Sequence, residues 1–114
     1  MRPDPAEVLL DLLNAARRCK QFVEGVAPTE FPADELRTSA VIYQLLILGE
    51  AAKRMPKAYC DAHAEIPWSD MARMRDRLIH AYHAVDLEIV ARMAYERIPE
   101  ILGTLERLLA QETG

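Results

Sequence analysis

The spacing of the apolar residues is the feature that most constrains the fold of this chain. Near its start, apolar residues recur every three or four positions, at Val8, Leu12, Ala16, Cys19 and Val23. This period places side chains on one face of an α-helix, whereas a strand needs alternation at every second residue. Similar spacing continues along most of the 114 residues, with four glycines to interrupt it. The sequence therefore predicts an all-α fold.

Local start and stop signals divide the chain into four main helices of an up-and-down bundle, which we expect to form a single domain over residues 1–114. Asp4 and Asp86 are expected caps of the first and last helices, and Pro56 ends the second. Pro99 should kink or split the last one. The expected helices cover residues 5 to about 25, 33–55, 68 to about 80 or 82, and 86 onward, with a weak helix or loop over 57–66.

The third helix opens at Pro67-Trp68-Ser69-Asp70, where Ser69 or Asp70 is available as a cap. The second helix is apolar around much of its circumference, so it must be covered on more than one side, in part by a second copy of the chain. Gly49 lies inside this second helix, where glycine is unfavourable. A close approach of another helix or of a ligand would explain it.

Composition excludes several classes of protein. Lys and Arg number 14 against 18 Asp and Glu, a net charge of −4, which argues against a non-specific nucleic-acid coat. No apolar run is long enough to span a membrane, and Met1–Pro5 lacks the features of a secretory signal, so we expect a cytoplasmic protein with no membrane partner. Two cysteines without a CxxC pattern argue against a disulfide scaffold or a zinc site.

A basic cluster in residues 71–83 stands out in this acidic chain. Its candidate functional residues are Arg73, Arg75, Arg77, His80, Tyr82 and His83, with one carboxylate, Asp76. Such a cluster suits a phosphate-bearing ligand, although a solvated helix face is the alternative. On an ideal helix Arg75 and Tyr82 share a face, whereas His80 lies roughly 140° from Arg75. The three converge if the helix ends near His80 or if Arg75 reaches across.

The spacing Arg75-x4-His80-x-Tyr82 resembles the motif of the HepT-like toxins in the HEPN superfamily. Leu48-Gly49-Glu50-Ala51-Ala52-Lys53 resembles a segment of their second helix, and Pro67-Trp68 and Val85-Asp86-Leu87 flank the motif in a similar way. The resemblance spans residues 5 to 110. One difference is Asp76, at a position where the family frequently has asparagine.

This resemblance implies a metal-independent ribonuclease toxin that needs no cofactor and cleaves tRNA or mRNA. It implies a homodimer whose interface brings two motifs into one cleft. It also implies a partner, a minimal nucleotidyltransferase antitoxin of the MntA-like kind, which forms a hetero-oligomer with the toxin. In HepT-like members the antitoxin silences the nuclease by transferring AMP to the motif tyrosine, which corresponds to Tyr82.

The residue types fit RNA cleavage. Imidazole titrates near neutrality, so His80 can remove the 2′-hydroxyl proton or protonate the leaving oxygen. Arg75 can stabilise the charge that develops on the phosphate, and Asp76 can orient either His80 or the arginine. Tyr82 can hydrogen-bond phosphate or stack on a base. Three further residues are candidates for substrate binding: Arg73, Arg77 and His83.

Several alternatives stay open. The chain could be a non-catalytic helical module that docks a nucleotidyltransferase and contacts only nucleotide or RNA phosphate, or a purely structural dimer. His80 and His83 could share a metal ion if Asp86 supplied a third ligand, but we expect no metal site. Glu50 is either a supporting partner of Arg75 or Arg77, or a solvent-facing residue.

Overall fold

The structure is a computed structural model that describes residues 3–81 and 84–114. Over these residues the chain forms helices and no strand, which confirms the all-α prediction. The elements are α1 (Pro5–Phe22), η1 (a 3₁₀ turn, Phe31–Ala33), α2 (Glu35–Arg54), α3 (Lys57–Ala62), α4 (Trp68–His80), α5 (Leu87–Arg92), η2 (a π-helix, Met93–Arg97) and α6 (Ile98–Thr113). None of the helices in this part of the chain is long and apolar enough to cross a membrane.

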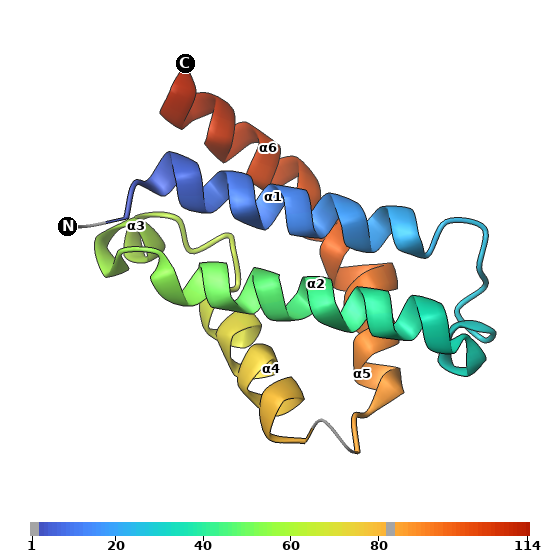
Figure 1. Ribbon diagram of the computed structural model, residues 1–114. Coiled ribbons are helices and arrows are strands. Elements are labelled where there is room, and N and C mark those ends of the chain that lie inside the picture. Colours follow the sequence, from blue (N-terminus) through green and yellow to red (C-terminus); the bar gives the residue numbers. More distant parts are fainter. Residues whose placement is uncertain (1–2, 82–83) are drawn as a thin grey trace.

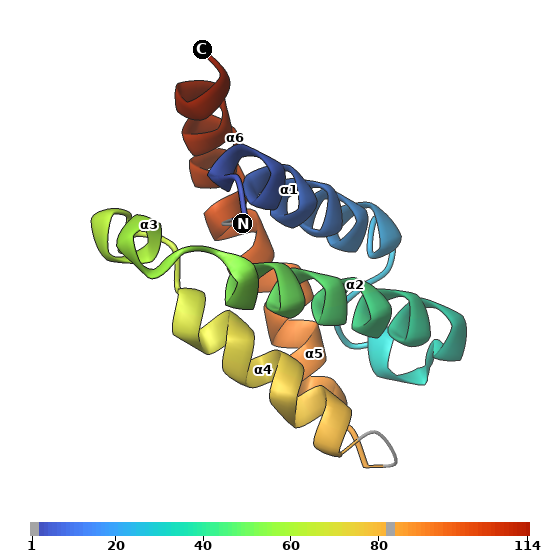
Figure 2. The same cartoon turned by 60° about the vertical axis from the view of Figure 1, so that its left-hand side comes forward.

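Helix α2 lies between α1 on one side and α4 on the other, as Figures 1 and 2 both show. The continuous segment α5–η2–α6 crosses behind this layer, with α6 packed on α1 and α5 against α2 and η1. The four expected main helices therefore correspond to α1, α2, α4 and the interrupted α5–η2–α6 segment. This arrangement confirms the predicted helical bundle.

One apolar core joins these helices. The largest side chains without appreciable exposure are Phe31, Leu9, Leu12, Leu13, Leu45, Leu48, Ile66, Met71, Ile98, Leu105, Leu108 and Val8. Burial of such side chains is the main driving force for folding. Cys19 lies in the same core, where burial raises the pKa of its thiol to about 12 and keeps it neutral.

Two of the predicted helix caps are confirmed. The carboxylate of Asp4 accepts a hydrogen bond from the amide of Ala6 at 3.0 Å, and that of Asp86 accepts from the amide of Glu88 at 3.0 Å. The expected interruption near Pro99 is also confirmed, because the π-helix η2 ends two residues before it. Proline has no amide hydrogen and its ring crowds the preceding turn, so a regular α-helix cannot continue through it unchanged.

The predicted cap of α4 is wrong. Pro67 precedes the helix and no side chain caps its first turn. Asp70 instead binds Arg73 at 2.6 Å and lies 3.6 Å from Arg97 of η2, so its carboxylate serves other cations. Trp68 anchors this end of the helix, because it is buried and donates from its indole nitrogen to the carbonyl oxygen of His63 at 2.9 Å.

The boundaries of the first two helices differ slightly from expectation. Helix α1 ends at Phe22, and Gly25 follows in a turn with a φ of +75°, a conformation that favours glycine. Helix α2 starts at Glu35, after η1, because Asp34 caps it by accepting from the amide of Arg37 at 3.0 Å. These are local differences of a few residues.

Candidate functional site

Helix α4 carries the candidate residues Arg75, Asp76 and His80, and His80 is its last residue. Of the two helix ends expected from the sequence, His80 and Tyr82, the structure shows the first, and Asp86 caps the next helix, α5. Tyr82 and His83 lie outside the described residues, so their candidate roles stay predictions.

Helices α2 and α4 lie close together at Gly49. A methyl group added at this glycine would overlap the Cβ atom of Arg75 and would lie 2.8 Å from the carbonyl oxygen of Met71. Of the two explanations proposed for a glycine here, helix–helix contact is the one that the structure shows. The contact fixes the base of the Arg75 side chain against the backbone of α2.

A chain of four alternating charges links α2 to α4 beside this contact. Nη2 of Arg75 lies 2.9 Å from Oε2 of Glu50, and Nη1 of Arg75 lies 3.0 Å from Oδ1 of Asp76. Nζ of Lys53 lies 3.1 Å from the same Asp76 oxygen. Glu50, for which two positions were open, is therefore a half-exposed partner of Arg75. We call these residues, Glu50, Arg75, Asp76 and Lys53, the ion chain.

Asp76 serves the arginine rather than the histidine. The hydrogen bond from Arg75, followed by that from Lys53, holds the pKa of the Asp76 carboxyl below its ordinary value, so it is ionised at neutral pH. No ion pair joins Asp76 to His80, although both are described and lie one helical turn apart. Of its two possible roles, orientation of Arg75 fits the structure.

Lys53 was not among the candidates from the sequence. A signal for it exists, because Glu50 and Lys53 are both charged, interrupt an apolar helix and stand three residues apart. That spacing places them on one side of the helix. Their partners on α4 are not evident from the sequence, because they depend on how two helices pack.

The other basic residues of α4 lie at the surface. Arg73 is exposed and its charge is balanced by Asp70. Arg77 and His80 are exposed, and neither forms an ion pair with any residue in the described part of the chain. Arg77 and His80 are thus accessible to a ligand from solution, whereas Arg75 is held in place with 26% of its side chain exposed.

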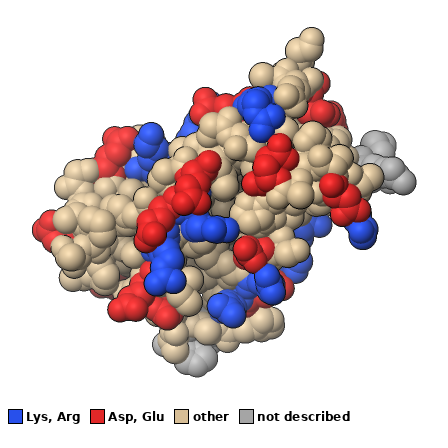
Figure 3. All heavy atoms as spheres, turned by 180° about the vertical axis from the view of Figure 1, so that it is seen from behind, with Lys and Arg blue, Asp and Glu red and all other residues tan. Residues whose placement is uncertain are grey.

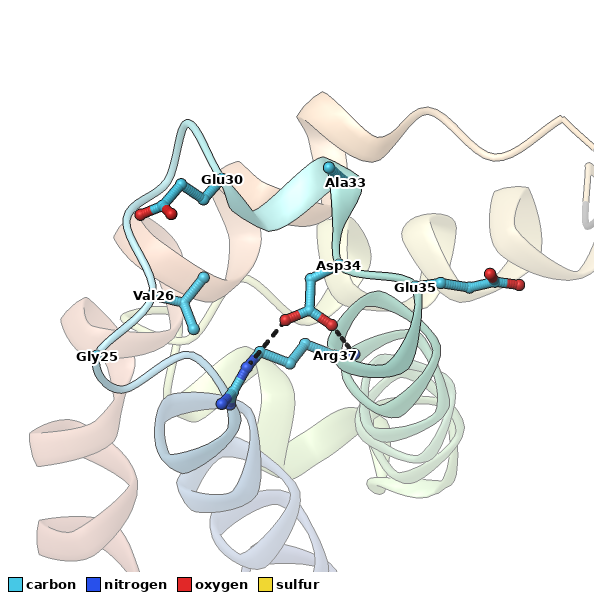
Figure 4. Close-up of a pocket in the computed structure, with 7 residues that line it drawn as sticks. All are labelled: Gly25, Val26, Glu30, Ala33, Asp34, Glu35 and Arg37. Atoms are coloured by element: carbon cyan, nitrogen blue, oxygen red, sulfur yellow. Dashed lines mark hydrogen bonds and ion pairs between the residues drawn. The ribbon is translucent and has the colours of Figure 1, made fainter.

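Two other features of the described part of the surface are less suited to a phosphate ligand. Acidic and basic side chains intermix over the described part of the face shown in Figure 3 and form no continuous basic surface there. A hollow lies at the α1–α2 connection (Figure 4), but Arg37 there is held by Asp34 and donates to the carbonyl oxygen of Phe22 at 2.7 Å. Outside residues 1–2 and 82–83, no three His, Cys, Asp or Glu side chains gather to hold a metal ion. The His80–His83 alternative falls partly beyond that range.

The fold and the site together define a small helical protein whose fixed arginine and exposed histidine suit phosphate chemistry. A family model described as ribonuclease HepT-like matches residues 12–108, and the chain belongs to this family. The resemblance to the HepT-like family is therefore confirmed, and the roles of Arg75, His80 and Tyr82 as its motif stay predictions.

Individual relatives agree with this assignment. A protein of Thermococcus cleftensis named as a ribonuclease HepT is 38% identical over 95% of this chain and 98% of its own length. A protein of Caldanaerobacter subterraneus subsp. tengcongensis that is named as an RNase is 32% identical over 95% of this chain and 96% of its own length. Another of Methanocaldococcus jannaschii, also named as an RNase, is 33% identical over 93% of this chain and 88% of its own length. No solved structure shows significant similarity to the chain.

Proposed function

We propose that this chain is a metal-independent endoribonuclease, the toxin of a toxin–antitoxin pair. The observation that carries the proposal is the geometry of α4 in a member of the ribonuclease HepT-like family. Arg75 is fixed against α2, and His80 stands exposed at the end of the same helix. A cation fixed on the same helix as an exposed imidazole is suited to phosphodiester cleavage.

The reaction needs a base, an acid and a charge stabiliser. A base removes the proton of the 2′-hydroxyl, the 2′-oxygen attacks phosphorus, and the bond from phosphorus to the 5′-oxygen breaks as an acid protonates that oxygen. We assign the acid and base roles to His80 and the stabilisation of the phosphoryl oxygens to Arg75. Asp76 orients Arg75, while Arg77, Arg73 and His83 hold the RNA backbone.

A homodimer would supply both an acid and a base from two copies of His80. Leu36 and Tyr43 support it, because they stand seven residues apart on α2 and are 81% and 62% exposed. Ile79, beside His80, is 40% exposed. Association of two chains through these apolar side chains would remove them from water and bring two copies of α4 together.

The second partner in this proposal is a nucleotidyltransferase antitoxin of the MntA-like kind, which transfers AMP to Tyr82. The added group carries negative charge and bulk to a position two residues after His80. It would repel and exclude the RNA phosphate, by the electrostatic logic of phosphorylation. We place this pair in the cytoplasm.

RNA cleavage in excess EDTA tests the proposal, with intact mass recorded to show that Tyr82 is unmodified. The parent protein should cleave, and His80→Ala should be slower by about 10²–10⁴-fold because an acid–base group is lost. Full activity in a folded, dimeric His80→Ala protein would refute the assignment. An unmodified dimeric parent that binds tRNA or mRNA but leaves it intact would instead indicate a non-catalytic binding module.

A further inference from the structure

Two side chains of α2 reach across to the motif helix. Glu50 and Lys53 stand three residues apart, on the side of α2 that faces α4. Glu50 forms an ion pair with one terminal nitrogen of Arg75, and Asp76 forms an ion pair with the other. Lys53 in turn binds the Asp76 oxygen that accepts from Arg75. Each end of the ion chain is therefore a residue of α2.

We propose that Glu50 and Lys53 are positioning residues that hold Arg75 in its productive orientation. This inference rests on the proposed function and adds two residues of α2 to its mechanism. A guanidinium group has five N–H donors, and the two contacts to Glu50 and Asp76 leave the others for a phosphate. Neither Glu50 nor Lys53 needs to touch the RNA.

The geometry explains why an arginine at this position needs such support. Its base is pressed against Gly49, but the rest of the side chain is long and has many rotamers. Carboxylates on both terminal nitrogens restrict the guanidinium to one orientation. Lys53 restricts Asp76 in the same way, so loss of Lys53 would loosen one of the two carboxylates.

The charges of the ion chain allow positioning to be separated from binding. Removing the negative charge of Glu50 raises the net charge around Arg75, so RNA binding should not weaken. The orientation of Arg75 in the transition state should suffer, because small misplacements of a catalytic group can reduce the rate about 10²-fold. A positioning role therefore predicts a lower kcat without a higher KM.

The main test compares Glu50→Gln with a matched control, Glu35→Gln. Glu35 is an exposed residue in the first turn of α2 and forms no ion pair within the described residues. Cleavage is assayed well below each Tm. We expect Glu50→Gln to lower kcat about 10- to 100-fold without raising KM, and the control to match the parent. A kcat within twofold of the control, or a loss confined to KM, would overturn the proposal.

Lys53 supplies a rescue experiment. Lys53→Gln should lower kcat, and Lys53→Arg should restore most of it, because arginine keeps a cation within reach of Asp76. Equal activity of both variants and the parent would overturn the role of Lys53.

A measurement without catalysis separates this inference from the proposed function. In ¹⁵N NMR of the free protein, the terminal nitrogens of Arg75 should show slow rotation in the parent and averaged signals in Glu50→Gln. Identical signals in both would overturn the inference even if the parent cleaves RNA. A parent that fails to cleave RNA would refute the proposed nuclease, and the NMR comparison would still decide whether Glu50 holds Arg75.

Discussion

The two flanks of α2 differ in what they contribute. The flank in the core presents Val41, Leu45 and Leu48, all without exposure. The flank toward α4 presents Gly49, then Glu50 and Lys53 in half-exposed ion pairs. Buried apolar side chains stabilise a fold strongly, whereas ion pairs in contact with water contribute little. The comparison suggests that one helix secures the fold on one side and orients site residues on the other.

The largest effect on stability should come from the core flank. We expect Leu45→Ala to lower the free energy of unfolding by about 2–5 kcal/mol, since it leaves a cavity among fully buried side chains. Urea denaturation measures this change. RNA cleavage per folded molecule should stay near that of the parent. A loss of unfolding free energy below about 1 kcal/mol would contradict the idea that the core flank of α2 secures the fold.

Gly49→Ala should affect both flanks. The added methyl group collides with Arg75 and with the backbone of α4, so we expect a loss of about 1–3 kcal/mol from overpacking. It should also displace Arg75 and slow RNA cleavage more than Leu45→Ala does. Gly103→Ala is the matched control, because Gly103 lies in α6 with open space around it. The control should gain about 0.5–1 kcal/mol. Equal behaviour of the two variants would contradict the close contact.

Asp34→Ala tests the start of α2, far along the helix from the ion chain. Loss of its cap to the amide of Arg37 should cost about 1 kcal/mol, measured as a lower urea midpoint. RNA cleavage by the folded protein should not change. Slower cleavage in this variant would show that the site responds to any change in α2, rather than to its α4-facing flank alone.

The smallest expected effect on stability is the pH dependence contributed by Asp76. Its pKa is lowered in the folded state, first by the Arg75 hydrogen bond and then by that of Lys53. The resulting stability is therefore present above the ordinary aspartate pKa and is lost as the pH falls through the lowered value. The difference in urea midpoint between the parent and Asp76→Asn should be constant from pH 7 to 5 and shrink toward pH 3. A difference in urea midpoint that grows as the pH falls would contradict this prediction.

Much of the fold is predictable because its signals are local. Apolar spacing identifies the helices, Asp4 and Asp86 cap them through amides two residues away, and Pro99 interrupts its own helix. Cap prediction fails at α4 because the helix begins at Trp68, which places Ser69 and Asp70 inside its first turn rather than before it. The carboxylate of Asp70 instead meets Arg73 and, from another element, Arg97.

In the candidate site, too, features within one helix are predictable from the sequence, whereas contacts between helices are not. The spacing from Arg75 to His80 and the end of α4 at His80 are readable from the sequence, since both concern one helix. The partner of Glu50 and the involvement of Lys53 are not, because an ion pair between helices depends on their crossing and on the small size of Gly49 at the contact.

By itself, the sequence determined an all-helical chain, the ends of its helices to within a few residues, and a motif that resembles that of HepT-like proteins. Periodicity, caps and proline act over one or two turns, so they need no knowledge of the rest of the chain. Only the tertiary structure decided which charges meet. Because the energies of half-exposed ion pairs are small, apolar packing sets the position of the helices, and the charged side chains then take the partners that this packing brings within reach.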